Sequence, residues 1–120
     1  MHIKNTHDIA PITSPHGETV HEYMGLAAGG ASNHSVAHIT LAPGKASHKH
    51  YHPVVEESYV MLTGSARMMI DRETQRLTVG DAVAIPPQAV HQIFNDSDEE
   101  ITFLAVCAPP WTPDCSVFVD

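Results

Sequence analysis

Residues 44–64 read Gly-Lys-Ala-Ser-His-Lys-His-Tyr-His-Pro-Val-Val-Glu-Glu-Ser-Tyr-Val-Met-Leu-Thr-Gly. His48, His50 and His52 are two residues apart, so in a strand their side chains project from the same face. Imidazoles at positions i and i+2 lie about 6–7 Å apart at the backbone, which lets both reach one divalent ion. After a proline-bent turn, Glu57 can return a carboxylate to that ion. This stretch therefore predicts a metal site on paired strands.

A second segment, residues 80–95, reads Gly-Asp-Ala-Val-Ala-Ile-Pro-Pro-Gln-Ala-Val-His-Gln-Ile-Phe-Asn. Its His91 lies on a predicted strand after a double-proline turn, which aims the side chain back across a barrel. A lone strand histidine is more often a core or surface residue than a ligand. Together with the first segment, however, His91 supplies a fourth protein ligand and leaves up to two positions of an octahedral ion open for water or substrate.

Short strand-like runs separated by Gly, Pro and Asp turns extend on both sides of these segments. No window of about 12 residues carries a capped helical pattern. About nine short strands of this kind indicate an antiparallel sandwich or small barrel. A length of 120 residues suits one core, so we expect a single domain over residues 1–120. The predicted strands cover residues 20–24, 36–41, 47–52, 59–62, 66–70, 77–79, 82–85, 90–94 and 101–106, with a hairpin tip at 72–75.

Composition narrows the classes of partner. Asp and Glu number 14 against 6 Lys and Arg, and a net charge of −8 argues against nucleic-acid binding. No apolar run approaches the ~20 residues of a membrane-spanning helix, and the N-terminus has no signal-peptide pattern, so we expect a cytoplasmic protein. In that compartment Cys107 and Cys115 are expected to be reduced, and a disulfide closing the Pro-rich loop between them is the alternative.

The two segments resemble the paired signatures of the cupin superfamily. In the first, a Gly, five residues, His-x-His, four residues, Glu, six residues and Gly are matched by Gly44, His50, His52, Glu57 and Gly64. In the second, a Gly, five residues, Pro-x-Gly, two residues, His, three residues and Asn are matched by Gly80, Pro86, His91 and Asn95, with Gln88 in place of the Gly. The resemblance implies an all-β, antiparallel jelly-roll β-barrel with its motif-bearing core at about residues 36–107, one metal ion inside it, and a homodimer.

Three imidazoles and one carboxylate suit a divalent transition metal, with Fe or Mn favoured and Zn or Ni as alternatives. Open coordination positions favour a small polar metabolite that chelates through oxygen atoms. We expect a metalloenzyme, with an O2-dependent dioxygenase slightly favoured over a non-redox lyase, isomerase or cyclase. A non-catalytic small-molecule-binding or sensory cupin is the remaining alternative.

Residues close to the predicted ligands have open roles. Tyr59 lies two residues beyond Glu57 and should face the same interior. Its phenol is either a general acid or base near the metal or a core hydroxyl held by a hydrogen bond. Glu56 is the alternative carboxylate, although the alternation with Tyr59 favours Glu57. His48 is interpreted as a partner of the ligands or as a residue at the entrance.

The other conspicuous side chains are interpreted without a chemical role. Met61, Met68 and Phe94 are predicted to be core rather than pocket wall. Trp111, in the Pro-rich tail, is expected to cover one barrel end or to lie at a dimer contact. Among the remaining histidines, only His34 and His38 have a spacing that weakly resembles that of a pair of metal ligands. Those histidines, interpreted as surface or strand residues, are His2, His7, His16, His21, His34 and His38.

Overall fold

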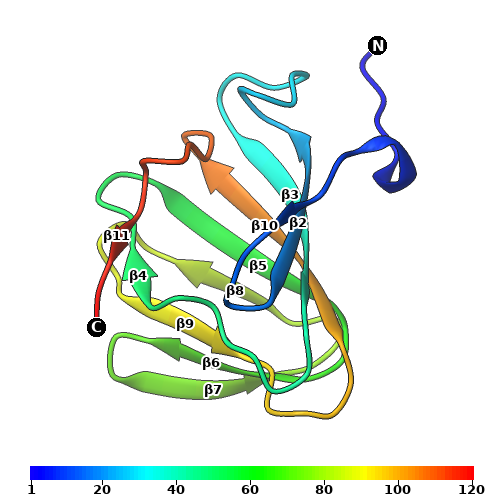
Figure 1. Cartoon of the computed structure of the whole chain (residues 1–120). Helices are drawn as coiled ribbons and strands as arrows, with labels where there is room; N and C mark the ends of the chain where they lie inside the picture. Colours follow the sequence, from blue (N-terminus) through cyan, green and yellow to red (C-terminus); the bar gives the residue numbers. More distant parts are fainter.

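The structure, a computed structural model, describes residues 1–120. Two antiparallel sheets face each other and curve into a barrel, which confirms the predicted all-β jelly roll (Figure 1). One sheet has the order β1-β2-β3-β10-β5-β8 and the other β11-β4-β9-β6-β7. The elements are η1 (Thr6–Asp8), β1 (Ile12–Thr13), β2 (Glu18–Met24), β3 (Ser35–Leu41), β4 (His50–Tyr51), β5 (Glu56–Thr63), β6 (Ala66–Ile70), β7 (Glu73–Leu77), β8 (Ala82–Ile85), β9 (His91–Phe94), β10 (Ile101–Ala108) and β11 (Val117–Phe118). No helix is long and apolar enough to cross a membrane.

Strand alternation divides the barrel interior into a packed half and a hollow half. On β10, Phe103 packs in the core, while the smaller Ala105 and Cys107 line a cavity. On β5, Met61 is core and Glu57 lines the same cavity. Large apolar side chains therefore fill one end, and small or polar side chains leave the other end open.

Met61 and Met68 are core, as predicted, whereas the same prediction for Phe94 was wrong; none of the three lines the cavity. Met61 and Met68 are buried in the core cluster. Phe94 is half-buried and lies outside the cavity lining, with the guanidinium carbon of Arg67 4.2 Å from its ring centroid.

The first histidine-bearing strand is shorter than predicted. Residues 47–52 were expected to form one strand, but only His50–Tyr51 does so. Ser47 still follows β9, since its backbone N donates to the carbonyl of Ile93 and its Oγ accepts from the Ile93 N. The hydrogen bond to the Ser47 hydroxyl thus replaces one of the backbone hydrogen bonds that a regular strand would make with β9. The predicted tip at 72–75 is also displaced, because β7 already begins at Glu73 and the turn centres on Asp71, which has a φ of 51°.

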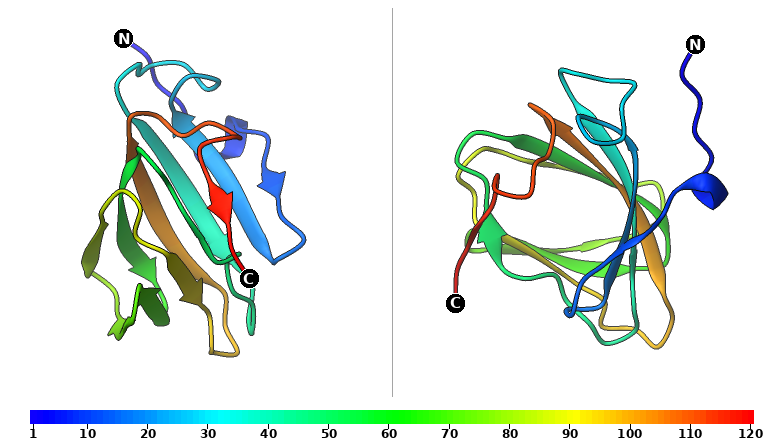
Figure 2. Two further views of the ribbon diagram at one scale, coloured as in Figure 1. Left: turned by 90° about the vertical axis from the view of Figure 1, so that its left-hand side faces the viewer. Right: turned by 45° about the horizontal axis from the view of Figure 1, so that its top comes forward.

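Both chain ends add short strands that the sequence pattern did not indicate. β1 and β11 have two residues each, which is too short for an alternation to be recognised. β11 pairs with β4, so the C-terminal segment lies along the barrel rim next to the histidine-bearing strand (Figure 2). In the right-hand view of that figure the N-terminal arm lies outside the barrel.

The turn before β9 explains why the second signature has a Gly at the position that Gln88 occupies in this chain. Gln88 occupies that position with a φ of 72°, in the left-handed region that favours glycine. Its backbone N donates to the carbonyl of His52 at 2.7 Å, which joins this turn to the segment that carries the predicted ligands. The turn geometry is therefore kept, at a conformational cost to a residue with a Cβ.

Gln88→Gly is expected to raise the free energy of unfolding by up to about 1.5 kcal/mol. Relief of left-handed strain is worth about 1–2 kcal/mol, and the greater chain entropy of glycine offsets about 0.5–1 kcal/mol of it. Urea denaturation compared with Gln88→Ala measures the effect. Equal stability of the Gly and Ala variants would contradict strain as the cause.

Candidate metal centre

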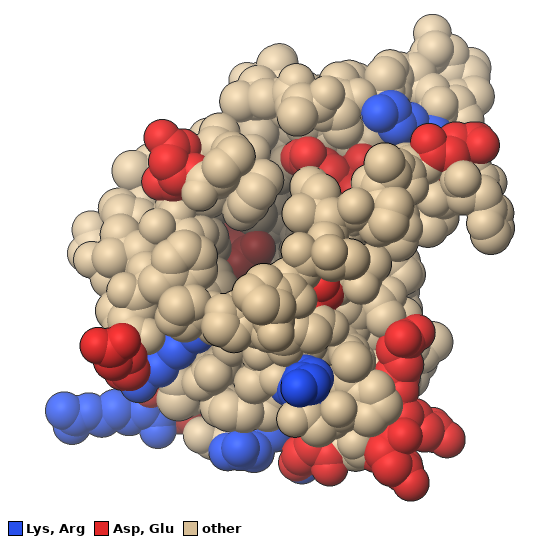
Figure 3. Space-filling view, viewed as in Figure 1, with Lys and Arg blue, Asp and Glu red and all other residues tan.

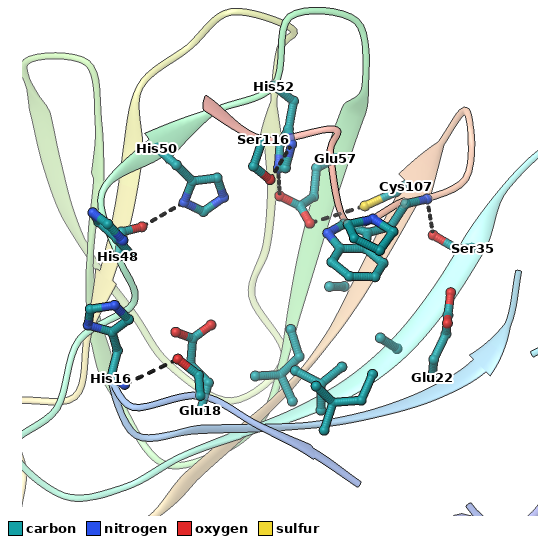
Figure 4. A pocket seen from close by; sticks show the side chains of 18 of the residues that line it. His16, Glu18, Glu22, Ser35, His48, His50, His52, Glu57, Cys107 and Ser116 are labelled. Atoms are coloured by element: carbon teal, nitrogen blue, oxygen red, sulfur yellow. Dashed lines mark hydrogen bonds and ion pairs between the residues drawn. The ribbon is translucent and has the colours of Figure 1, made fainter. Parts of the chain in front are cut away.

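Four predicted ligands converge in the hollow half of the barrel. His50 on β4 lies directly opposite His91 on β9, and His52 and Glu57 flank the turn between β4 and β5. One ligand atom from each residue lies within 4.8 Å of all the others. Nε2 of His52 and Nε2 of His91 are each 3.3 Å from Oε1 of Glu57. Figure 4 shows His50, His52 and Glu57 pointing toward the same space.

Backbone carbonyls fix the orientation of the three imidazoles. In each ring Nδ1 lies within hydrogen-bond distance of a carbonyl, so Nδ1–H donates and the lone pair of Nε2 faces the other ligand atoms. This arrangement is the one found around metal-binding histidines, where the second nitrogen holds the ring in place. The carbonyls belong to His48 for His50 (2.6 Å), Cys115 for His52 (3.0 Å) and Ala89 for His91 (2.9 Å).

Orphaned polar atoms show that the group fits a cation. Nε2 of His52, Oε1 of Glu57 and Nε2 of His91 are buried and have no hydrogen-bond partner. Each such atom costs about 1–3 kcal/mol when left unpaired. These three atoms adjoin one another. They belong to a set of three imidazoles and one carboxylate, which are the donors that divalent transition metals bind. The group could therefore hold a metal ion.

The charge states also suit a cation. Burial alone would raise the pKa of Glu57, but its contacts with His52 and His91 outweigh burial and lower that pKa to about 2. Burial and the neighbouring His91 lower the pKa of His50 to about 4. The pKa of His52 is raised, because the Glu57 carboxylate more than offsets burial. At neutral pH the centre therefore has an ionised carboxylate and a neutral His50.

In the metal-free protein, His50 is expected to contribute a loss of about 2 kcal/mol of stability as the pH falls from about 6.5 to 4.5, while Glu18 and Glu22, whose pKa values are raised by burial, contribute in the opposite direction. In this window the unfolded chain protonates His50, whereas the folded chain, with its pKa near 4, does not. Protons thus favour the unfolded state. Urea denaturation in EDTA across this window measures the loss, and His50→Gln should remove most of it. A variant that keeps the same pH slope would contradict this origin.

A cavity of about 450 Å³ opens beside the four residues. In Figure 3 this face of the molecule is hollowed, with carboxylate atoms inside the hollow. Tyr59 lines the cavity, as its alternation with Glu57 predicted, and the centre of its ring is 6.3 Å from that of His91. Burial, and then the charge of Glu57, raise the pKa of Tyr59 well above 10, so its phenol stays protonated. Glu56 is exposed, as the alternation predicted.

Several cavity residues were not foreseen from the sequence. The thiol of Cys107 donates to Oε2 of Glu57 at 3.1 Å, and both cysteines are free. Glu18 and Glu22 face inward from β2, which their alternation with Val20 could have suggested. His16 is exposed, as expected of a surface residue, but it also lines the cavity, which the sequence did not indicate.

Other side chains occupy places close to those expected. His48 lines the cavity and stacks on Phe118, with 4.5 Å between ring centres, which places it at the entrance. Trp111 lines the cavity, and its backbone N donates to Oγ of Ser35 at 2.9 Å, so it covers part of the barrel end. His38 pairs with His21 across β2 and β3, rather than with His34, because the strand register places the two opposite each other.

The two facing sheets form a jelly-roll barrel. At one end of the barrel, three histidines and a carboxylate converge, as they do in barrels that bind a metal ion. The family model that matches is the cupin domain, over residues 37–107, and the chain belongs to this family. An uncharacterized protein of Methanocaldococcus jannaschii is 28% identical, over 92% of this chain and 89% of that protein.

Solved structures of cupin enzymes are also similar. A Lactobacillus farciminis oxalate decarboxylase is 25% identical with a TM-score of 0.82, covering 94% of this chain but only 34% of the decarboxylase. A sugar phosphate isomerase of the cupin superfamily from Silicibacter pomeroyi is 25% identical with a TM-score of 0.78, covering 97% of this chain and 80% of the isomerase. Together with the donor group, these matches support a metal-dependent cupin.

Proposed function

We propose that this cupin is a metal-dependent enzyme that carries out a non-redox reaction, as a lyase, isomerase or cyclase, on a small polar metabolite. The observation that carries the proposal is the phenol of Tyr59, buried beside the candidate metal centre and facing the cavity. A bound divalent ion would polarise a chelating oxygen of the substrate. The chain would supply the proton.

The surroundings of Tyr59 suit a proton donor. Its ring packs against Phe103, with 4.8 Å between ring centres, and against His91, so its position is fixed. Burial and the charge of Glu57 keep the pKa of the phenol well above 10. The hydroxyl group therefore keeps its proton until a substrate oxygen or carbon with developing negative charge accepts it.

The O2-dependent dioxygenase is the second candidate. It is favoured by the donor set, because three imidazoles and one carboxylate suit iron(II) and leave positions for substrate and dioxygen. A dioxygenase has no need of a protonated phenol at the centre. For this reason the cavity favours the non-redox reaction.

A substrate screen of metal-loaded protein, run with and without oxygen, separates these functions. The non-redox proposal expects anaerobic turnover, which Tyr59→Phe lowers at least about a hundredfold while the metal content stays unchanged. Tyr51→Phe, which removes a hydroxyl outside the cavity, is the matched control. Turnover that requires O2 would favour the dioxygenase, and ligand binding without any turnover would favour a binding cupin. Unchanged turnover in Tyr59→Phe would remove the phenol from the mechanism.

The homodimer remains a proposal, and the outer face of the six-stranded sheet supports a second copy as the occupant. Except for Glu56 at one end, the outward positions of β2, β3, β10 and β5 carry no charged side chain. His38, Leu104 and Val60 form a cross-strand row at the centre of this face. Light scattering is expected to give twice the 13.0 kDa of the chain, and Leu104→Lys to give the monomer. A monomeric native protein would refute the dimer.

A further inference from the structure

We infer that Glu18 selects the ligand of the cavity: the substrate presents a hydroxyl or ammonium donor to this carboxylate and carries no phosphate. The inference rests on the proposed function, because it names the substrate class of the same cavity. It depends on the charges that line the cavity, on the free acceptor atoms there, and on the apolar residues beside Glu18.

The charge of the cavity disfavours anionic ligands. Its lining includes three carboxylates, from Glu18, Glu22 and Glu57, and no Lys or Arg. With all three carboxylates ionised, a bound divalent ion would leave the cavity with a net charge of about −1. A phosphate monoester adds about −1.5 to −2, and proteins hold it with Arg, Lys or helix N-termini. The only helical element, η1, has three residues and lies outside the lining, so this cavity has none of these groups.

Glu18 is an acceptor without a protein partner. The alternation of β2 turns Glu18, Val20 and Glu22 into the cavity, and Figure 4 shows the Glu18 carboxylate facing the open space, across from His50. Its side chain makes no hydrogen bond or ion pair within the chain, and burial raises its pKa by more than the nearby His16 lowers it. Glu22 likewise has a buried Oε1 without a partner. Carboxylates in such places are satisfied by donors from water or from a ligand.

The same cavity has a second set of unpartnered atoms, which indicates where the other end of a ligand binds. His52 is 2% exposed and Glu57 is 6% exposed. Nε2 of His52 and Oε1 of Glu57 face the candidate metal centre, and neither atom has a hydrogen bond. Beside Glu18, Val20 on β2 and its cross-strand partner Ile39 on β3 add an apolar surface to the cavity lining. The ligand class is therefore a molecule with a chelating head, an uncharged middle and a donor tail.

Two matched pairs of 2-hydroxy acids test this class on the Mn²⁺-loaded protein. Gluconate and 6-phosphogluconate share a chelating head and differ by a phosphate, whereas 2-hydroxyhexanoate and 6-amino-2-hydroxyhexanoate differ by an ammonium group. Calorimetry is expected to show that gluconate binds at least about tenfold more tightly than 6-phosphogluconate. 6-Amino-2-hydroxyhexanoate should bind at least about threefold more tightly than 2-hydroxyhexanoate. Because the head is constant within a pair, each ratio reports on the tail.

Substitutions at Glu18 should change both ratios. Glu18→Gln should abolish the ammonium preference, and Glu18→Lys should reverse the phosphate preference. Glu73→Lys makes the same change in net charge on the exposed β7 and should change neither ratio. Circular dichroism checks folding, and Glu18→Gln remains informative where Glu18→Lys does not fold.

Three results would overturn the inference: equal binding of gluconate and 6-phosphogluconate by the native protein, ratios unchanged in the Glu18 variants, or no binding of any of the four compounds. Metal content measured on the same samples tests the proposed function separately. Metal-free protein would refute a metal-dependent enzyme, whereas metal-loaded protein that prefers the phosphate compound would refute only the role of Glu18.

Discussion

His91→Ala is expected to lower the affinity of the protein for Mn²⁺ or Fe²⁺ at least about a hundredfold. His91 is fully buried, its Nδ1–H donates to the Ala89 carbonyl, and its Nε2 lies 3.3 Å from Oε1 of Glu57. Alanine removes one of four converging donors, and no neighbouring side chain of this group can replace it. Metal content after dialysis against a chelator buffer measures the loss.

A stability measurement gives a second readout of the same substitution. A ligand that binds only the folded state stabilises it by about 2.7 kcal/mol when its concentration is 100 times its dissociation constant. Added metal should therefore raise the unfolding midpoint of the native protein but not that of His91→Ala. His38→Ala, which removes an imidazole outside the cavity, should keep both the metal and the midpoint shift. Equal metal content in native protein and His91→Ala would contradict the centre.

Strand periodicity explains why the candidate centre was predictable. A period of two residues placed His50 and His52 on one face, and the same period separated Glu57 from Glu56. These features depend on neighbours close in sequence.

The other half of the cavity depends on contacts between distant segments. Glu18 and His16 reach the cavity only because β2 pairs with β3 and closes that side of the barrel. Cys107 meets Glu57 because β10 and β5 are in register there, which no local pattern indicates. The short β11, which brings Phe118 onto His48, is set by its pairing with β4. These cavity-lining residues were therefore harder to find than the predicted metal ligands.

Asn95, the last residue of the second signature, is a structural residue, and Asn95→Ala is expected to lower the free energy of unfolding by about 3 kcal/mol. The side chain is 1% exposed. Its Nδ2 donates to the carbonyls of Leu41 and Glu99 at 3.0 and 2.7 Å, and its Oδ1 accepts from the N and Oγ of Ser97. Alanine leaves these buried groups without partners at the place where β9 ends and the turn to β10 begins.

Asn95→Asp separates the two halves of this network. Aspartate keeps an acceptor for Ser97 but places a carboxylate oxygen against the carbonyls of Leu41 and Glu99, so urea denaturation should show a loss at least as large as that of alanine. Native-like stability of Asn95→Asp would mean that the contact with Ser97 alone matters. Because Asn95 lies outside the cavity, both variants should keep their metal at temperatures where they are folded, in contrast to His91→Ala. This contrast distinguishes a residue that holds the barrel together from one that belongs to the centre.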